Sequence, residues 1–398
     1  MLTKLLLSCD DYIYIYKGNT YASISGKPDF FERYLRVFDS VRIVARSKVV
    51  FDPPEETFVK IDNDRIEIWE VPFFRGPIQF IKSYLRIQKS LRDVTVGCDV
   101  AILRLPSTTA YQVLNFVLKN KLPFAIEVVA NPYDSIRTSQ TLMNKYYYKS
   151  WDKDLLKACR FADGISCVTE KYMQKRYFPL KQNSFTAHYS SIALPLSSYS
   201  SPKNFPQKQT LQVLHVANHI IYGGTKGHKE LIEAASIVIA KGFKINVVFV
   251  GKNNNNGIEK LNTLAKEFGI AEIVTFLGYQ KTSQDLLNII NQSDIFVLPT
   301  KSEGLPRSII EAMSQGLPCV STNISGNSEL IENDFLIPNY NDIELLAHKI
   351  IILLSNPEVY ESSSKRNFER SKNYEMTILQ NKRDEFYTRL KERVSPPH

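Results

Sequence analysis

Two glutamates separated by seven residues, Glu303 and Glu311, have the surroundings best suited to chemistry in this chain of 398 residues. An apolar run of strand type, 294–298, precedes them, and a helix is predicted to start near Pro306 and to end at Gly316. The first turn of such a helix has unpaired N–H groups and a positive dipole end, which favour a bound anion. Carboxylates repel phosphate, so we expect these two to hold hydroxyl groups. A ligand with both a diphosphate and hydroxyls, such as a nucleotide sugar, fits this pattern.

Two further loops are predicted at the same edge of a sheet. One follows a strand predicted at 211–217 and contains Asn218, Gly224 and Lys226; the other spans 325–329 after a later strand. Glycine lets the backbone approach a phosphate, and lysine near a helix start supplies a compact positive charge. Ligands of open α/β sheets bind beyond the carboxyl ends of the strands. We therefore expect the three loops to share one rim.

Composition describes a globular protein with excess positive charge. Hydrophobic residues make up 43% and charged residues 23%, which argues against a disordered chain. The net charge of +9 suits nucleic acid, phosphorylated substrates or an acidic membrane face. The five cysteines are scattered without paired spacing, so we expect a reduced, cytosolic protein with no disulfide framework and no zinc site. No apolar run approaches the ~20 residues that span a bilayer.

Alternating strand-like and helix-like runs predict an α/β fold with two parallel-sheet domains. The first domain is expected at 1–200 and the second at 207–355, separated by a serine- and proline-rich linker. The segment 356–398 is predicted to be helical, charged and packed back on the first domain. A further helix at 140–160 carries aromatic and basic residues, including Tyr146 and Trp151. It could face a membrane or an acceptor, or it could be a core helix with a solvated basic side.

The stretch 303–320 resembles the family-4 glycosyltransferases, retaining enzymes with the GT-B fold of two facing Rossmann-like domains. The spacing of Glu303 and Glu311 matches the mark of that family, and Lys226-Gly227 and the loop from Gly326 to Glu329 match its other donor-side motifs. The resemblance covers about 210–340. The first half of the chain resembles the family only in its α/β order.

The resemblance implies roles for individual residues. Glu303 and Lys226 would be catalytic, with Glu303 on the sugar hydroxyls of the donor and Lys226 on its diphosphate. Glu311 would bind the nucleotide ribose. The remaining donor-binding positions would be Asn218, Gly224, Gly304, Leu305, Pro306, Arg307 and Glu329. No metal site and no metal cofactor are implied, because the nucleotide diphosphate sugar is the donor substrate.

The chain departs from the family pattern in three places. Ala217-Asn218 stands where the family usually has glycine and arginine, which leaves Lys229 or Arg307 to supply the second cation. The first domain has only Gly18 and Gly26 where a glycine cluster is usual. The region from Glu127 to Asp134 stands where a histidine is often found. Acceptor-side residues are therefore not assigned.

Four other interpretations compete with sugar transfer. Glu311 alone could be a surface glutamate and Glu303 a charge that stabilises a helix start. A hydrolase with two catalytic carboxylates is disfavoured by their short separation within one turn and helix. Nucleic-acid binding lacks any recognisable motif, whereas a non-catalytic nucleotide-sugar-binding protein of the same fold remains open. His219 and His228 could line the site or be satisfied or exposed histidines.

We therefore expect a hexosyltransferase that moves a sugar, with retention of configuration, from a nucleotide diphosphate sugar to a glycan or lipid-linked acceptor. The expected setting is assembly of bacterial surface polysaccharide or glycolipid. Peripheral contact with an anionic membrane, on the inner face of the plasma membrane, is a further hypothesis that the basic surface suggests.

Overall fold

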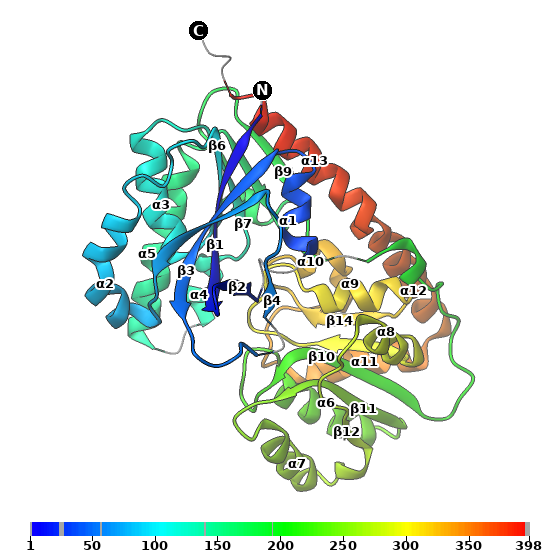
Figure 1. Cartoon of the computed structure of the whole chain (residues 1–398). Helices are drawn as coiled ribbons and strands as arrows, with labels where there is room; N and C mark the ends of the chain where they lie inside the picture. Colours follow the sequence, from blue (N-terminus) through cyan, green and yellow to red (C-terminus); the bar gives the residue numbers. More distant parts are fainter. Residues whose placement is uncertain (1, 24–27, 56–57, 139–140, 193, 395–398) are drawn as a thin grey trace. The chain divides into compact units, whose positions relative to one another are not determined.

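Two α/β sheets organise the chain, each in its own unit (Figure 1). The computed structural model describes residues 2–23, 28–55, 58–138, 141–192 and 194–394. One unit comprises Met1–Ile136, Thr141–Tyr189 and Gln380–His398, and the other comprises Arg137–Gln140 and Ser190–Leu379.

Seven parallel strands form the centre of the first unit's sheet, in the order β5-β3-β1-β6-β7-β8-β9. Their bounds are β1 Lys4–Tyr16, β3 Ser40–Val49, β5 Ile66–Pro72, β6 Val100–Leu105, β7 Phe124–Val128, β8 Gly164–Cys167 and β9 Phe185–His188. β7 and β8 are buried along their whole length, as strands covered by helices on both faces must be. The predicted parallel sheet is confirmed here.

The first sheet also has an antiparallel extension that the sequence analysis did not predict. β2 (Asn19–Ala22) pairs antiparallel with the end of β1, and β4 (Val59–Lys60) pairs with β2. The two-residue turn between β1 and β2 consists of Lys17 and Gly18, both with positive φ. Such a turn matches the twist of a hairpin, so the chain reverses there instead of crossing over.

Helices cover both faces of the first sheet. α2 (Gly76–Ser90), α3 (Thr108–Lys119) and α5 (Leu142–Cys159) contribute to one apolar core with the strands. α1 (Pro28–Leu35) and the later part of α13 (Met376–Lys391) lie on the other face (Figure 1). α4 (Pro132–Thr138) follows β7. The C-terminal helix thus packs back on the first unit, as predicted.

A buried carboxylate holds α13 to this sheet. Glu127 at the end of β7 accepts hydrogen bonds from the hydroxyls of Tyr387 (2.6 Å), Tyr34 (3.0 Å) and Tyr189 (3.0 Å). Arg104 of β6 lies 3.6 Å from the same carboxylate. Burial alone would raise the pKa of Glu127, but the positive charge of Arg104 and the hydroxyl donors outweigh it and lower that pKa. Glu127 is therefore a buried anion that three elements share.

The second unit contains a sheet of six parallel strands in the order β12-β11-β10-β13-β14-β15. The strands are β10 Leu211–Ile220, β11 Ile245–Asn253, β12 Val274–Phe276, β13 Ile295–Leu298, β14 Cys319–Thr322 and β15 Leu336–Ile337. Counted from β10 as the first strand, this is the order 3-2-1-4-5-6 of a dinucleotide-binding fold. The chain changes direction across the sheet between β10 and β13, so the crevice for a ligand opens there.

Seven α-helices of the second unit are described around its sheet: α6 His228–Ala240, α7 Gly257–Glu267, α8 Ser283–Gln292, α9 Arg307–Ser314, α10 Asn327–Leu330, α11 Ile343–Ser355 and α12 Pro357–Ser371. α6 contacts α7 and α11, whereas α9 contacts α8 and α12. The buried side chains of α6 and α9 recur at helical spacing, and their apolar faces cover the strands next to the switch point. The positions of the two loops that precede these helices are thereby set by the core.

Candidate functional site

The loops after β10 and β13 meet at the switch point of the second sheet. The N–H of Lys301 donates to the carbonyl of Thr225 (2.7 Å), and the hydroxyl of Thr300 donates to the same carbonyl (2.9 Å). Gly227 approaches so closely that a Cβ there would lie 2.1 Å from the carbonyl oxygen of Pro299, and its φ is +77°. Only glycine meets both demands. The two loops form one fixed wall.

Lys226 and Glu303 lie across this junction. The ammonium of Lys226 is 2.5 Å from a carboxylate oxygen of Glu303. The side chain of Glu303 is 10% exposed and that of Lys226 is 34% exposed, so the pair is open to solvent from the lysine side. The structure thus joins the two residues predicted to be catalytic in one ion pair. A bound diphosphate could draw the ammonium toward itself without moving the backbone.

A third loop fastens the turn that follows Glu303. The carbonyl of Gly304 accepts hydrogen bonds from the N–H of Gly326 and the hydroxyl of Ser325, both at 2.9 Å. Ser325 has a φ of +43° and is buried. The loop leads into α10, where Glu329 is partly exposed. The three predicted loops therefore do share one rim.

The start of α9 supplies backbone donors next to this turn. Pro306 is the N-cap, and the first hydrogen bond of the helix runs from the N–H of Ile310 to the carbonyl of Pro306 at 3.4 Å. The N–H groups of Arg307 and Ser308 precede that bond and so have no acceptor within the helix. Leu305 is buried and Arg307 is exposed. The predicted helix start near Pro306 is confirmed to within one residue.

Glu311 lies one turn further along α9. No hydrogen bond or ion pair within the described residues holds its carboxylate, which is half-buried. Burial raises the pKa of Glu311, and the nearby charge of Arg307 only partly opposes this effect. A carboxylate in this state is suited to accept hydrogen bonds from uncharged hydroxyl groups.

One predicted residue, Asn218, is placed differently from the expectation. Asn218 was predicted in a loop, but β10 continues to Ile220, because His219 and Ile220 still pair with β11 after an irregularity in register. Asn218 is therefore an exposed residue of the strand end. Gly224 is in the loop, partly exposed, as predicted.

Ion pairing distinguishes the cations that could replace the missing arginine. Lys229 is bound to Glu233, 3.4 Å away along α6. Arg307 makes no ion pair within the described residues and lies at the helix start. Lys301, which the sequence analysis did not single out, lies 3.0 Å from Glu230 and 4.5 Å above the ring of Tyr340. Of the three cations, Arg307 is the one available to a ligand.

Two buried histidines, His215 and His228, pack against each other beneath the loops of the site. The Nδ1–H of His215 on β10 donates to the carbonyl oxygen of Val297 (2.9 Å), and the His215 ring lies 4.5 Å from that of His228 at the start of α6. His219, by contrast, is exposed. His228 thus packs in the core instead of lining the site. Sequence spacing could not reveal the pair, because 12 residues separate them and the contact depends on how α6 packs on β10.

We expect the stability of the second unit to depend on pH through His228. Burial, and then the charge of Lys226, lower the pKa of His228 to about 4. The unfolded chain binds a proton below about 6.5, so the free energy of unfolding should fall by about 3 kcal/mol as the pH drops from 6.5 to 4. Urea unfolding across this range measures the slope.

A matched pair of variants tests whether His228 causes this pH dependence of the unfolding free energy. The slope measures how many more protons the unfolded state binds than the folded state. H228Q should lower that number by about one, whereas H348Q, on an exposed position of α11, should leave the slope unchanged. His215 contributes in the same direction, since burial and His228 lower its pKa. Parallel curves for wild type and H228Q would refute the assignment.

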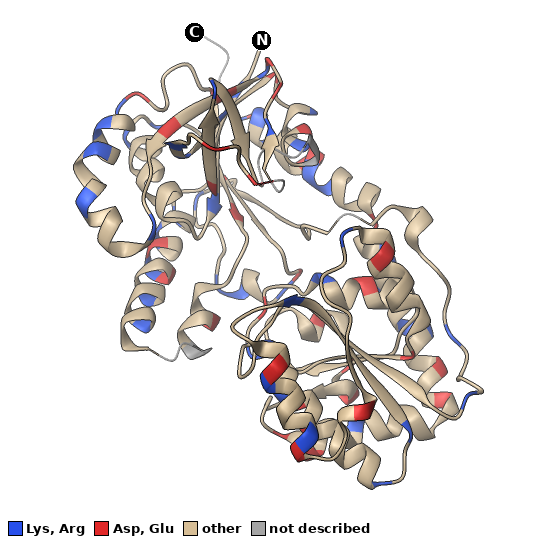
Figure 2. Cartoon of the chain, turned by 60° about the horizontal axis from the view of Figure 1, so that its bottom comes forward, with Lys and Arg blue, Asp and Glu red and all other residues tan. Residues whose placement is uncertain are grey.

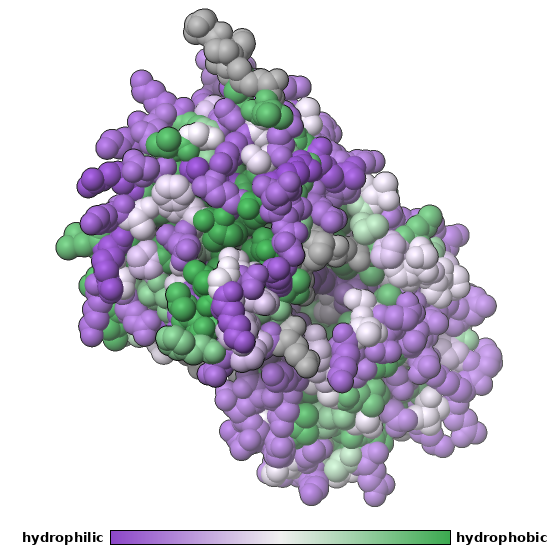
Figure 3. Space-filling model, in the orientation of Figure 1, coloured by the Kyte–Doolittle hydropathy of each residue, from purple (hydrophilic) through white to green (hydrophobic). Residues whose placement is uncertain are grey.

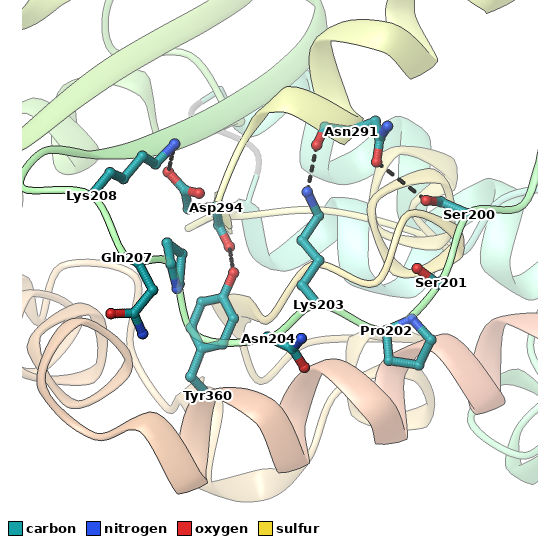
Figure 4. A pocket seen from close by; sticks show the side chains of 11 residues that line it. Ser200, Ser201, Pro202, Lys203, Asn204, Gln207, Lys208, Asn291, Asp294 and Tyr360 are labelled. Carbon is teal, nitrogen blue, oxygen red and sulfur yellow. Dashed lines mark hydrogen bonds and ion pairs between the residues drawn. The ribbon is translucent and has the colours of Figure 1, made fainter.

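A hollow of about 430 Å³ lies elsewhere in this unit (Figure 4). It borders the segment 200–208 and Asp294, which immediately precedes β13, so it is at the amino ends of the strands. Its polar groups are engaged: Lys208 pairs with Asp294 (2.7 Å), and Tyr360 donates to the carbonyl of Asp294 (2.9 Å). This hollow is not on the rim of the three loops, and we assign it no ligand.

The second sheet has the strand order of a dinucleotide-binding fold, and its loops bring Lys226, the helix-start amides of α9 and the carboxylates of Glu303 and Glu311 to the switch point. The chain belongs to the glycosyltransferases of group 1. The profile described as "Glycosyl transferases group 1" matches residues 202–370, which include all three loops.

Two similar proteins match most of the chain, and a third matches part of it. An uncharacterised glycosyltransferase of Haemophilus influenzae is 32% identical over 80% of this chain and 84% of its own length. Protein CapJ of Staphylococcus aureus is 25% identical over 86% and 84%, respectively. An Escherichia coli galactosyltransferase that acts on GlcNAc-diphosphoundecaprenol is 33% identical, over 30% of this chain and 31% of that protein.

Solved structures share the fold at low sequence identity. HepE of Anabaena, in complex with UDP, superposes with a TM-score of 0.63 at 14% identity, over 96% of this chain and 98% of its own. The sucrose-phosphate synthase of Thermosynechococcus elongatus gives a TM-score of 0.68 at 15% identity, over 98% and 99%. The predicted α/β fold of the GT-B type, with Rossmann-like parallel sheets, is confirmed.

Proposed function

We propose that this glycosyltransferase moves a hexose from a nucleotide diphosphate sugar to a glycan or lipid-linked acceptor, with retention of configuration. The observation that carries the proposal is the ion pair of Lys226 and Glu303, 2.5 Å apart, at the switch point where three loops are bonded together. HepE, which shares the fold, binds UDP. The acceptor class is suggested by the relative that acts on a diphosphoundecaprenol-linked sugar.

Each group then has a task set by its chemistry. Lys226 and the first-turn N–H groups of α9, with Arg307 as the second cation, hold the diphosphate. Glu303 accepts from the hydroxyls of the sugar and Glu311 from those of the ribose. Gly304, Leu305 and Pro306 shape the turn. The other donor-binding residues are Glu329 on α10, Gly224 in the loop after β10 and Asn218 at the end of β10.

Catalysis follows from the charge that develops as the donor breaks. The departing nucleoside diphosphate gains negative charge, and the anomeric carbon gains positive charge. Lys226 and the amides at the start of α9 are held by the loop contacts before the reaction, so little reorganisation is needed when the charge appears. Preorganised groups of this kind usually contribute the largest share of a rate enhancement. Glu303 offers negative charge near the sugar.

The setting we propose is assembly of bacterial surface polysaccharide or glycolipid, at the cytoplasmic face of a membrane. Among the residues that the structure describes, no helix is long and apolar enough to cross a bilayer.

A donor screen by thermal shift tests the proposal. A donor present at about a hundred times its Kd stabilises the folded state by about 2.7 kcal/mol, so Tm should rise by several degrees. UDP-, GDP- and ADP-linked sugars are compared, each with and without EDTA, because we also propose that no metal is required. The shift should shrink in K226A and persist in K260A, where Lys260 is an exposed lysine of α7.

Two results would count against the proposal. The first is that no nucleotide sugar changes Tm in the wild type. The second is an equal shift in wild type and K226A, which would place the ligand elsewhere.

A further inference from the structure

We propose that α2, together with the exposed start of α5, is a docking surface for an anionic lipid bilayer. This inference deepens the proposed function, since it assigns the surface by which the enzyme would reach a lipid-linked acceptor. It concerns only the first unit and depends on its exposed side chains.

The outer side of α2 is unusually apolar for an exposed helix. Ile78, Ile81 and Leu85 are 70%, 71% and 81% exposed, and Tyr84 is 42% exposed. At 3.6 residues per turn, these positions form one stripe on the side opposite Ser83 and Ile87, the two buried residues of the helix. Three large aliphatic side chains standing together in water mark a site of contact with another apolar phase.

A cationic stripe runs beside the apolar one. Lys82, Arg86 and Lys89 follow the same helical spacing, and Arg75 and Arg92 flank the helix. Between Val71 and Arg92 there is no aspartate or glutamate, and Figure 2 shows Lys and Arg but no acidic residue on α2. None of the five cations forms an ion pair with another described residue. These exposed cations are therefore available to an anionic partner.

The start of α5 extends this surface. Leu142, Met143 and Tyr146 are 84%, 71% and 79% exposed. Lys145 and Lys149 lie between and after them, and the segment 141–151 has no acidic residue. Figure 3 shows hydrophobic side chains interspersed with hydrophilic ones along the edge of the first unit where Figure 1 draws α2 and α5.

The remaining aromatic residues of α5 do not belong to the surface. Tyr147 bonds to the hydroxyl of Thr108 (3.0 Å), and its ring is 4.7 Å from that of Trp151. The carbonyl of Trp151 accepts from the hydroxyl of Tyr111 (2.8 Å). Tyr147 and Trp151 therefore pack toward the interior, as expected if this helix belongs to the core. Of the aromatic residues discussed here, only Tyr146 is assigned to the membrane-facing surface.

A cavity shows that the two helices are neighbours. About 230 Å³ in volume, it is bordered by Pro77 and Phe80 of α2 and by Tyr147 and Trp151 of α5. The exposed apolar residues of the two helices lie outside the lining of this cavity, which also includes Asp10 and Asp154. The proposed surface therefore consists of two apolar stripes on neighbouring helices.

The chemistry of this surface favours lipid over a protein partner. An interfacial helix typically has a polar face rich in Lys and Arg and large apolar residues on the other, and it lies in the headgroup plane. Each cation near an anionic leaflet contributes about 1 kcal/mol. The seven cations named on α2, its flanks and α5 therefore complement a diffuse negative surface. A second copy of this chain would present the same positive charge and would be repelled.

Cosedimentation of the full chain with vesicles tests the inference. Vesicles of phosphatidylcholine alone are compared with an equimolar mixture of phosphatidylcholine and phosphatidylglycerol, at low and high salt. We expect binding to the mixed vesicles only, and weaker binding at high salt. I81D and L85D should each lower the partition coefficient about tenfold or more, because each loses the burial of a large aliphatic side chain.

Matched controls separate this surface from general charge and exposure. K82E should weaken binding severalfold, whereas K260E, which makes the same charge change on an exposed lysine of α7, should have a smaller effect. L196D changes a leucine that is 69% exposed in the other unit and should bind like wild type. Donor-induced thermal shifts are recorded on the same samples without vesicles, so a failure of docking is distinct from a failure of donor binding.

Three outcomes would overturn the inference: equal binding to neutral and anionic vesicles, wild-type binding by I81D and L85D, or equal losses in K82E and K260E. A dimer that forms without vesicles and is lost in I81D would assign the face to a second copy instead.

Discussion

Replacing Glu303 by alanine is expected to lower the rate of sugar transfer by about 10²–10³-fold, the range typical of losing one preorganised polar group at a reacting centre. The change removes the acceptor for sugar hydroxyls that we assign to Glu303. It also frees Lys226, whose ammonium is 2.5 Å from that carboxylate. Release of the nucleoside diphosphate, measured at saturating donor and acceptor, reports the rate.

Two further substitutions separate the functions of the pair. E303Q retains a hydrogen-bond acceptor but removes the charge, so it should be less impaired than E303A. K226M removes the cation and should lower both donor affinity and transfer rate, since Lys226 is assigned to the diphosphate in ground state and transition state alike. The double variant should lose less than the sum of the single losses, because residues in direct contact are not additive.

E233A is the matched control, because Glu233 pairs with Lys229 on α6 at 3.4 Å, and neither residue is assigned to the reaction. Wild-type transfer by E303A would remove the catalytic assignment. If the wild type binds the donor but transfers sugar to none of the acceptors tested, the chain would instead be a non-catalytic nucleotide-sugar-binding protein.

The sequence was most informative where function depends on a contiguous segment. The turn from Glu303 to Pro306 and the helix to Glu311 could be predicted because strand, turn and helix signals follow one another within 18 residues. Parallel sheets could be predicted from alternating strands and helices. The meeting of the Lys226 loop with the Glu303 loop was inferred only in general terms, since both follow strands. The contact itself requires that β10 and β13 be neighbours, although about 75 residues separate them.

Contacts across the fold could not be predicted in this way. β10 extends through Asn218 because β11 continues beside it, and no local signal in either strand reveals the partner. The hairpin of β1 and β2 depends on Lys17 adopting positive φ, which a lysine rarely does. On α5, Tyr146 is exposed and Tyr147 is partly buried, and this difference depends only on the direction in which the two adjacent side chains project.

Glu127 makes tertiary contacts on which the stability of the first unit should depend. Its region was noted in the sequence only for lacking a histidine, yet the carboxylate is 4% exposed and joins β7 to α1, to the residue after β9 and to α13. Replacing Glu127 by alanine should destabilise the first unit by about 3–5 kcal/mol, because Arg104 would be left as a buried charge with its partner removed. Chemical unfolding followed by tryptophan fluorescence reports this unit, since Trp69 and Trp151 both lie in it.

The tyrosines separate the contribution of the hydrogen bonds from that of the charge. Y387F keeps the ring, which lies 5.1 Å from that of Tyr34, and removes only the hydroxyl donor at 2.6 Å, so we expect a loss of about 1–2 kcal/mol. Y146F, at a hydroxyl that is exposed on α5, should cost nothing measurable. Hydrogen exchange should then show faster opening of the later half of α13 in Y387F, ahead of the rest of the unit. If E127A unfolds at the same denaturant concentration as wild type, the carboxylate does not stabilise this unit, and α13 must be held by its apolar contacts, such as that between Phe386 and Phe185, alone.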